Sequence, residues 1–378
     1  MAVTIHDNPS DWSPSDNPLK YRFSSNQTAQ ANFSYVVETY FNNTLVSEDR
    51  VFPESGIYAH IDISPIVKNL LSVPVLTNTI WQQAGIDGKI KIKVWENYGT
   101  PAVNQASATS SETNIFKACL SDRDWMSWNY TVYDVASLGS FMTYRAPSSD
   151  GKVYKIREDD FYLNIIQDGS ETLTVELYDG ATLLDTYTDT QDFSIAQVNI
   201  NSYTLQNDCG FGILDLTLAD SVKVYIGSGK PSTIYFYTVG CNPAYTLEWI
   251  NQLGAWDSFI FAHNIEQSFD VTERSYTRKF GSWNGSIFSY NLNDAGNVRV
   301  GTQQTDKMTI YTDWITETEQ HFLLTCYKAP RFYLFNLGDE IAVKITSTQG
   351  KYHYARWEEL ISEAVDLQLV NNHNGISL

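Results

Sequence analysis

Thr172-Leu173-Thr174-Val175-Glu176-Leu177-Tyr178 alternates between polar and apolar residues at every position, and Asp179-Gly180 follows it directly. A second strand-like run, Thr182 to Thr188, comes after this dipeptide. Strict alternation is the pattern of a strand with one buried face. Because Asp-Gly between two such runs is a strong signal for a tight hairpin, the stretch predicts a pair of antiparallel strands.

Strand signals continue on both sides of this hairpin. Upstream, Asp160 to Ile166 is predicted as a strand that ends at Asp168-Gly169. Downstream, Val222–Ile226 and Thr233–Val239 flank Gly227–Pro231, whose composition is typical of a turn. We therefore expect residues 150–240 to form a β-sandwich domain.

The preceding region, residues 18–145, is expected to be a separate β domain. Tyr35–Phe41 and Tyr58–Ile63 are rich in aromatic and β-branched residues, which favour strands. Asn42-Asn43 is predicted to turn the chain into a partner strand, and Ser64-Pro65 has the residue types that begin a helix. The small polar residues 97–113 predict a long loop, and residues 139–151 predict a linker or domain boundary.

The most regular strand of this region carries a row of lysines. In Lys89-Ile90-Lys91-Ile92-Lys93-Val94-Trp95, the apolar residues are expected to face the core and the lysines the opposite side. Lysines on a strand usually mark a solvated or edge face. A second interpretation is a basic contact row for an acidic neighbouring copy.

Two groups of tryptophans are candidates for contacts. Residues 1–17 are polar and rich in Pro, Asp and Ser, and they predict an extended N-terminal arm with no packed element, in which Trp12 docks on its own domain or on a neighbouring subunit. Trp125 and Trp128 lie close together in sequence with two tyrosines. Core packing or a subunit contact is the simpler interpretation, and stacking against sugars is the alternative.

The last region, residues 241–378, mixes strands with helix. Thr316 and Glu319 have the spacing of a capping box, so a helix is expected near 316–328, ending before Pro330. Tyr333–Phe335 and Ile341–Ile345 are predicted strands. A helical face is predicted for Trp357, Leu360, Ile361 and Ala364, followed by a strand with Val365, Leu367 and Leu369 on one face.

Composition limits the classes of function. The chain of 378 residues has a net charge of −19, which repels phosphate backbones, so nucleic acid is not expected as a partner. An acidic surface serves solubility, or it meets basic neighbours or divalent ions. No apolar run approaches the roughly 20 residues of a membrane span, and the first residues lack the features of a secretory signal. We expect folding in the cytoplasm of the cell that makes the protein.

The sequence offers no recognisable catalytic or metal-binding motif. The six histidines and four cysteines do not form a zinc or nucleophile spacing, and neither HExxH nor Gly-x-Ser-x-Gly occurs. The cysteines are interpreted as reduced, mostly buried thiols, with a Cys209–Cys241 bridge as the alternative. Glu158-Asp159-Asp160 is interpreted as a solvated turn, with weak cation binding as the alternative. We therefore predict a protein that is not an enzyme and has no catalytic residue, cofactor or metal.

In Leu247–Phe259 an apolar run leads into Asn251, Leu253-Gly254 and Trp256-Asp257, and this segment resembles a recurring pattern in virion proteins of tailed phages that infect Bacteroidetes. The pattern is an apolar strand followed by Leu-Asn-x-Leu-Gly-Gly-aromatic-Asp, and this chain has Ala255 at the second glycine of Leu247–Phe259. Looser similarities occur at Asp16–Pro18, at Phe52-Pro53 before Asp62–Val67, and at Asp313–Glu319 before Ala329–Leu334. The resemblance implies a structural component of the tail, baseplate or collar, with no catalytic residues.

Together these observations predict a mainly β protein of two to three antiparallel β-sandwich-like domains with a few short helices. The expected function is that of a multicopy virion structural protein, whose partners are copies of itself and other virion proteins. The alternative is a receptor- or glycan-binding module at a tail tip or fibre that recognises a host surface glycan. The candidate interface residues are Trp12, Lys89, Lys91, Lys93, Trp125, Trp128 and Trp256.

Overall fold

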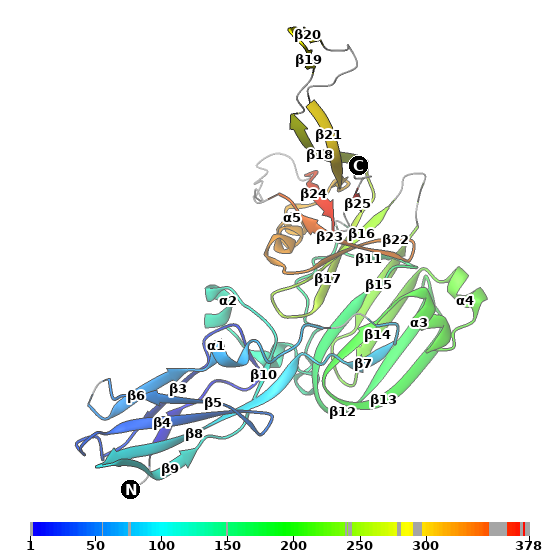
Figure 1. Ribbon diagram of the computed structural model, residues 1–378. Helices are drawn as coiled ribbons and strands as arrows, with labels where there is room; N and C mark the ends of the chain where they lie inside the picture. Colours follow the sequence, from blue (N-terminus) through cyan, green and yellow to red (C-terminus); the bar gives the residue numbers. More distant parts are fainter. Residues whose placement is uncertain are drawn as a thin grey trace. The chain divides into compact units, whose positions relative to one another are not determined.

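The computed structural model describes residues 3–54, 56–74, 77–148, 150–238, 240, 244–277, 281–289, 297–347, 361–370 and 373–374. The chain forms two compact units, which we call the first and the second unit. The first comprises Met1–Tyr237 together with Trp249–Ser258, and the second comprises Thr238–Glu248 together with Phe259–Leu378. The predicted fold class is confirmed, because strands arranged in several sheets dominate both units and the helices are short (Figure 1).

Two sheets at the start of the first unit share one apolar core. The smaller sheet has the order β1 (Thr4–Asp7), β3 (Lys20–Ser24), β6 (Tyr58–Asp62). The larger has the order β2 (Ser13–Pro14), β10 (Thr113–Phe116), β8 (Asp87–Gly99), β4 (Ser34–Phe41), β5 (Thr44–Val51), and β9 (Ala102–Thr109) also pairs with β8. Tyr21 and Phe23 of β3 pack with Tyr35 of β4 and Ile92 of β8, which is the arrangement of a sandwich.

Local signals in this region produced the expected elements. Asn42 and Asn43 both have positive φ, at 47° and 65°, and they connect β4 to β5 in the twist that favours Asn in two-residue hairpins. The helix α1 (Ser64–Val67) has Pro65 in its first turn, as predicted, but the prediction of Ser64 as the N-cap is wrong, because Ser64 is the first helical residue and Ile63 is the N-cap.

Two predictions for this region were wrong. Residues 97–113 are not a loop, because β8 continues to Gly99 and β9 pairs back onto it. The small polar residues there lie on a largely exposed strand, which does not need an apolar face. Residues 1–17 also contain packed elements: β1 pairs with β3, and β2 pairs with β10. Trp12, which is 1% exposed, holds this segment in the core.

A second large sheet of the first unit has the strand order β11 (Val153–Ile156), β15 (Ser232–Tyr237), β14 (Ser221–Ile226), β12 (Tyr162–Asp179), β13 (Thr182–Asn199), β7 (Trp81–Gln83). The hairpin predicted at Asp179-Gly180 joins the 18-residue strands β12 and β13, which run side by side (Figure 1). The predicted strand end at Asp168-Gly169 is instead a bulge, and β12 continues through it. Most described pairs are antiparallel, whereas β2–β10 and β11–β15 are parallel.

Short helices connect the strands of the first unit. They are α2 (Asp122–Met126), η1 (Tyr130–Val132), η2 (Val135–Ser137), α3 (Ser202–Asn207) and α4 (Ile213–Leu218). The predicted linker near residues 139–151 is partly core, because Phe141 and Met142 are buried. The Pro, Ser and Asp content of this segment is typical of a linker, but its apolar side chains are buried in the core.

The second unit is built on a sheet with the order β17 (Trp256–Phe261), β16 (Tyr245–Ile250), β22 (Phe332–Asn336), β23 (Asp339–Ile345), β24 (Ala364–Leu369), β21 (Asn297–Tyr311), β18 (Ile265–Thr277). Further elements are β25 (His373–Asn374) on β21, the pair β19 (Ser282–Asn284) and β20 (Ile287–Ser289), α5 (Glu317–Leu323) and η3 (Leu324–Lys328). The division between the units falls within the hairpin β16–β17, whose tip Trp249–Ser258 belongs to the first unit.

Predictions for the second unit were largely confirmed. Thr316 and Glu319 form the capping box of α5, and the helical segment ends before Pro330. Val365 and Leu367 are buried on β24, as the alternation indicated. The predicted helical face is wrong at Ile361, which forms a β-bridge, and at Ala364, which begins β24, while Trp357 and Leu360 lie outside the described residues.

Candidate interaction surfaces

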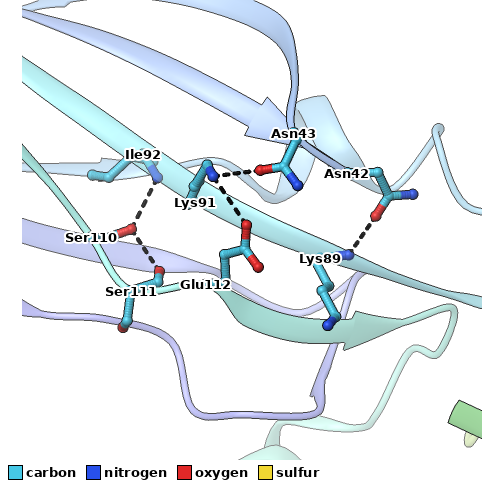
Figure 2. A network of polar contacts seen from close by, with 8 residues as sticks. All are labelled: Asn42, Asn43, Lys89, Lys91, Ile92, Ser110, Ser111 and Glu112. Atoms are coloured by element: carbon cyan, nitrogen blue, oxygen red, sulfur yellow. Dashed lines mark hydrogen bonds and ion pairs between the residues drawn. The ribbon is translucent and has the colours of Figure 1, made fainter.

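The lysine row of β8 lies on the face opposite the core, as predicted, and Figure 2 shows the polar contacts of Lys89 and Lys91. Ile90, Ile92 and Val94 are fully buried. Lys91 donates to the Asn43 side chain and forms an ion pair of 3.0 Å with Glu112. This contact lowers the pKa of the Glu112 carboxyl.

The other two lysines differ from Lys91. The Lys93 ammonium lies 4.0 Å from the centre of the Trp95 ring, in a cation–π contact. Lys89 is exposed, and its backbone N–H donates to Asn42 Oδ1. Since β8 lies between β10 and β4, the row is not an edge. Two of the three ammonium groups therefore have partners within their own chain, and a basic contact row for a second copy would retain Lys89 alone.

The structure brings three of the candidate tryptophans together. Trp12 is buried, and Trp125 and Trp128 pack partly buried against the same core. The indole N–H of Trp128 donates to the backbone carbonyl of Trp12 at 2.9 Å, and its ring stacks on Tyr133 with centroids 5.7 Å apart. Trp12 and Trp128 thus serve internal packing. Trp256 lies apart from them, 1% exposed and beside Tyr162.

A small hollow of about 170 Å³ lies next to this tryptophan cluster. Its lining includes Trp128, Tyr133, Tyr144 and the carboxylate of Asp124. Burial raises the pKa of both tyrosines, and the nearby carboxylates of Asp124 and Asp257 raise it further. The hollow therefore combines aromatic surface with hydroxyl and carboxylate groups, which are the groups that bind polar ligands with an apolar face.

Residues 251–257 form a buried polar turn in the first unit. Asn251 Oδ1 accepts hydrogen bonds from the backbone N–H groups of Leu253 and Ala255, at 2.9 and 3.1 Å. Asn251 Nδ2 donates to the carbonyl of Met142 and to Asp257 Oδ2, at 3.1 and 2.9 Å. The conspicuous polar residues of this motif therefore shape the turn, and they do not face solvent.

Asp257 links this turn by hydrogen bonds to residues 143–144, which precede β11 in the sequence. Its fully buried carboxylate accepts hydrogen bonds from the Thr143 hydroxyl and from the backbone N–H of Tyr144. Burial raises the pKa of Asp257, while Arg145 and the hydrogen bonds oppose that rise.

The strands β18 (Ile265–Thr277) and β21 (Asn297–Tyr311) form a long ribbon in the second unit, and β18 is exposed over almost its whole length. One face of the ribbon begins in the core, where Met308 is 5% exposed. Further along the same face, Phe269 is 63% exposed and Val271 is 43% exposed. A hollow of about 450 Å³ lies beside Phe269 and Met308. The face that carries Met308 therefore continues into solvent, where Phe269 and Val271 are exposed beside the polar residues Gln267, Gln304 and Asp306.

A small hairpin lies between the two ribbon strands in the sequence and also carries exposed apolar side chains. The strands β19 and β20 pair so that Trp283 lies opposite Phe288, with ring centroids 5.6 Å apart. Trp283 and Ile287 are each 70% exposed, and Phe288 is 44% exposed. We call these two strands the tip hairpin. Exposed contiguous apolar groups of this kind mark interaction sites in soluble proteins.

Neither the ribbon nor the tip hairpin was expected from the sequence. The alternation of Gln267, Phe269, Val271 and Glu273 was a usable strand signal. The sequence did not indicate that these residues would be exposed. The burial of a strand depends on which other strands pair with it and cover it, and the local alternation does not specify those partners.

No protein-family model matches the chain, and no curated protein matches it. Within the described residues, no helix is long and apolar enough to cross a membrane. The same residues contain no group of three or more His, Cys, Asp or Glu placed to hold a metal ion. Cys119, Cys209 and Cys326 carry free thiols, and Cys241 lies outside the described part of the chain.

Proposed function

We propose that this chain is a multicopy structural protein of a phage virion, in the tail, baseplate or collar, and that it assembles through contacts between subunits. The observation that carries the proposal is the set of large apolar side chains left exposed on the ribbon and on the tip hairpin. Large aromatic side chains at such a surface supply contact area and become binding hot spots when a partner covers them.

Two further features support this proposal. The strand β18 lies at the end of its sheet order, so its outer edge offers backbone groups to an added strand. The resemblance of Leu247–Phe259 to segments of phage virion proteins supports the virion as the location. The proposed function is structural: copies of the chain bind one another and other virion proteins, and the protein catalyses no reaction.

Replacing Phe269 and Trp283 together with serine is expected to weaken self-association at least tenfold. Burying an aromatic side chain contributes about 1.5–3 kcal/mol, and about 1.4 kcal/mol corresponds to a tenfold change in affinity. Static light scattering over a range of protein concentrations measures the effect. We call this double substitution the ribbon variant.

The matched control is Met126→Ser in the first unit, which removes a side chain that is 88% exposed and lies outside the ribbon. Its self-association should equal that of the unchanged chain. A chain that stays monomeric at every concentration, or a ribbon variant that associates as well as the control, would contradict the proposal.

The hollow beside Trp128 favours a second candidate, a module that binds a host surface glycan. If this function is correct, the protein binds an oligosaccharide saturably, and Tyr144→Phe weakens binding severalfold because it removes one hydroxyl from the lining. Titration calorimetry against a glycan panel measures this. Val103→Ala, at an exposed position outside the lining, is the control. Binding that is absent, or equal in both variants, argues against a glycan site here.

A further inference from the structure

The strand β18 has an outer edge that the described part of the chain leaves open. It ends the strand order of its sheet, and among the described residues it pairs with β21 alone. Every residue from Glu266 to Thr277 is exposed. A long open edge is a template for pairing with another chain, and proteins that avoid such pairing often place lysine or proline there. The sequence of β18 contains neither.

The central part of this edge is regular. The pairing of β18 with β21 continues without a bulge over residues 265–274. Side chains therefore alternate between two faces along this stretch. The odd-numbered residues, which include Phe269 and Val271, lie on the face that carries Met308, and the even-numbered residues lie on the opposite face.

The charged residues of β18 differ in whether their own chain neutralises them. Asp270 and Glu273 form ion pairs with basic residues of β21, at 2.5 and 3.1 Å. Glu266 and Arg274 form no ion pair with the described residues. Both of them lie on the even-numbered face, and Asp270 is midway between them in the sequence. The edge thus carries one available negative charge and one available positive charge at equal distances from its centre.

We propose that β18 of one copy pairs antiparallel with β18 of a second copy, about a two-fold axis at Asp270. This inference rests on the proposed function and names the strand that is added to the ribbon. In this register Glu266 of each copy lies opposite Arg274 of the other. Phe269 of each copy lies opposite Val271 of the other. Opposite charges and apolar side chains at directly opposed positions both stabilise a strand pair.

The neighbouring registers lose this complementarity. Moving the axis by one residue keeps each side chain on its face, but it changes every opposed pair. In one direction Val271 lies opposite Gln267, and in the other Phe269 lies opposite Glu273. Both shifts also separate the two available charges. Because the edge matches itself in both charge and apolar pattern, a second copy suits it better than an unrelated strand does.

The proposed register also places Asp270 opposite Asp270 of the second copy. Each of these carboxylates keeps its ion pair with Lys307 of its own chain, so the repulsion between them is reduced. The contact is isologous, because both copies use the same surface, and it therefore closes on a pair of subunits. A larger ring would combine this pair with a further contact.

The test reverses each available charge separately. Glu266→Arg brings two arginines face to face at both ends of the strand pair, and Arg274→Glu brings two glutamates face to face. Like charges at directly opposed positions destabilise a strand pair, so each variant alone should associate roughly tenfold more weakly than the unchanged chain. Glu158→Arg, the same change at an exposed position of the first unit, is the control and should associate normally. Circular dichroism verifies that all three variants are folded.

An equimolar mixture of the two reversed variants tests the register. In a mixed pair, the introduced arginine of one variant lies opposite the introduced glutamate of the other. The unchanged Arg274 and the unchanged Glu266 also lie opposite each other. The mixture should therefore associate as tightly as the unchanged chain. Light scattering measures the mass of the complex, and a tag on one variant verifies that it contains both.

Two results would overturn the inference while leaving the proposed function intact. One is that both reversed variants associate as well as the unchanged chain, while the ribbon variant does not. The other is a mixture that associates no better than either reversed variant alone, although the unchanged chain forms a defined oligomer. An unchanged chain that is itself monomeric at every concentration would overturn both proposals.

Discussion

Replacing Gly254 with alanine is expected to lower the free energy of unfolding of the first unit by about 3 kcal/mol or more. Gly254 has a φ of +75°, a conformation that costs other residues about 1–2 kcal/mol. A Cβ atom there would also lie 1.9 Å from the backbone carbonyl oxygen of Lys117. A backbone atom cannot move aside as a flexible side chain can, so the turn must shift away from its hydrogen bonds.

Gly210→Ala separates these two causes. Gly210 has nearly the same φ, +74°, but a Cβ atom there would meet nothing within 4 Å. It should therefore lose only the conformational part, about 1 kcal/mol. Urea denaturation followed by circular dichroism measures both variants. Equal losses for the two alanines would show that the approach of Gly254 to Lys117 does not matter.

The second large effect is expected for Asn251→Asp. This change keeps the shape of the side chain and the acceptor for Leu253 and Ala255, but it replaces the Nδ2 donor with a carboxylate oxygen. That oxygen would lie 2.9 Å from Asp257 Oδ2 in a buried site. An uncompensated charge in such a place costs about 3–5 kcal/mol, so we expect a loss of that size at pH 7.

The loss should shrink in acid, and the sign follows from the two pKa values. Two adjoining buried carboxyls share a proton, so their folded-state pKa lies above that of the unfolded chain. Their stabilising contribution is complete below the unfolded pKa and is lost as the pH rises through the folded pKa. Urea denaturation at several pH values measures this, with Asn26→Asp at an exposed site as the control. A loss that does not vary with pH would refute the explanation.

Sequence reasoning predicted the elements that are specified locally. Asn42-Asn43, Asp179-Gly180 and the Thr316–Glu319 capping box each act through neighbouring backbone, and all three formed as expected. The errors arose where a distant strand decides the outcome. Residues 102–109 became strand β9 because β8 offers them a partner, although their own side chains do not favour a strand.

The candidate surfaces were harder to predict for the same reason. Trp12 and Trp256 attracted attention as large aromatic residues, but the structure buries both of them. Phe269 and Trp283 have ordinary sequence surroundings, and they become conspicuous only because the described part of the second unit leaves them exposed. A high aromatic content shows that the chain has many large side chains that could contact a partner. The tertiary structure decides which of these side chains are exposed and which are buried in the core.

The hairpin tip Trp249–Ser258 has a consequence for biosynthesis. It contributes Asn251 and Asp257 to the first unit, yet it follows the rest of that unit after residues that belong to the second. During translation, residues 1–237 emerge before Asn251 and Asp257 have been synthesised. The backbone N–H of Tyr144 and the carbonyl of Met142 therefore lack these hydrogen-bond partners at that stage. The first unit can therefore complete its folding only after residue 258 has emerged from the ribosome. Residues 238–248 of the second unit must be synthesised before that point, so the folding of the first unit is delayed by the synthesis of part of the second.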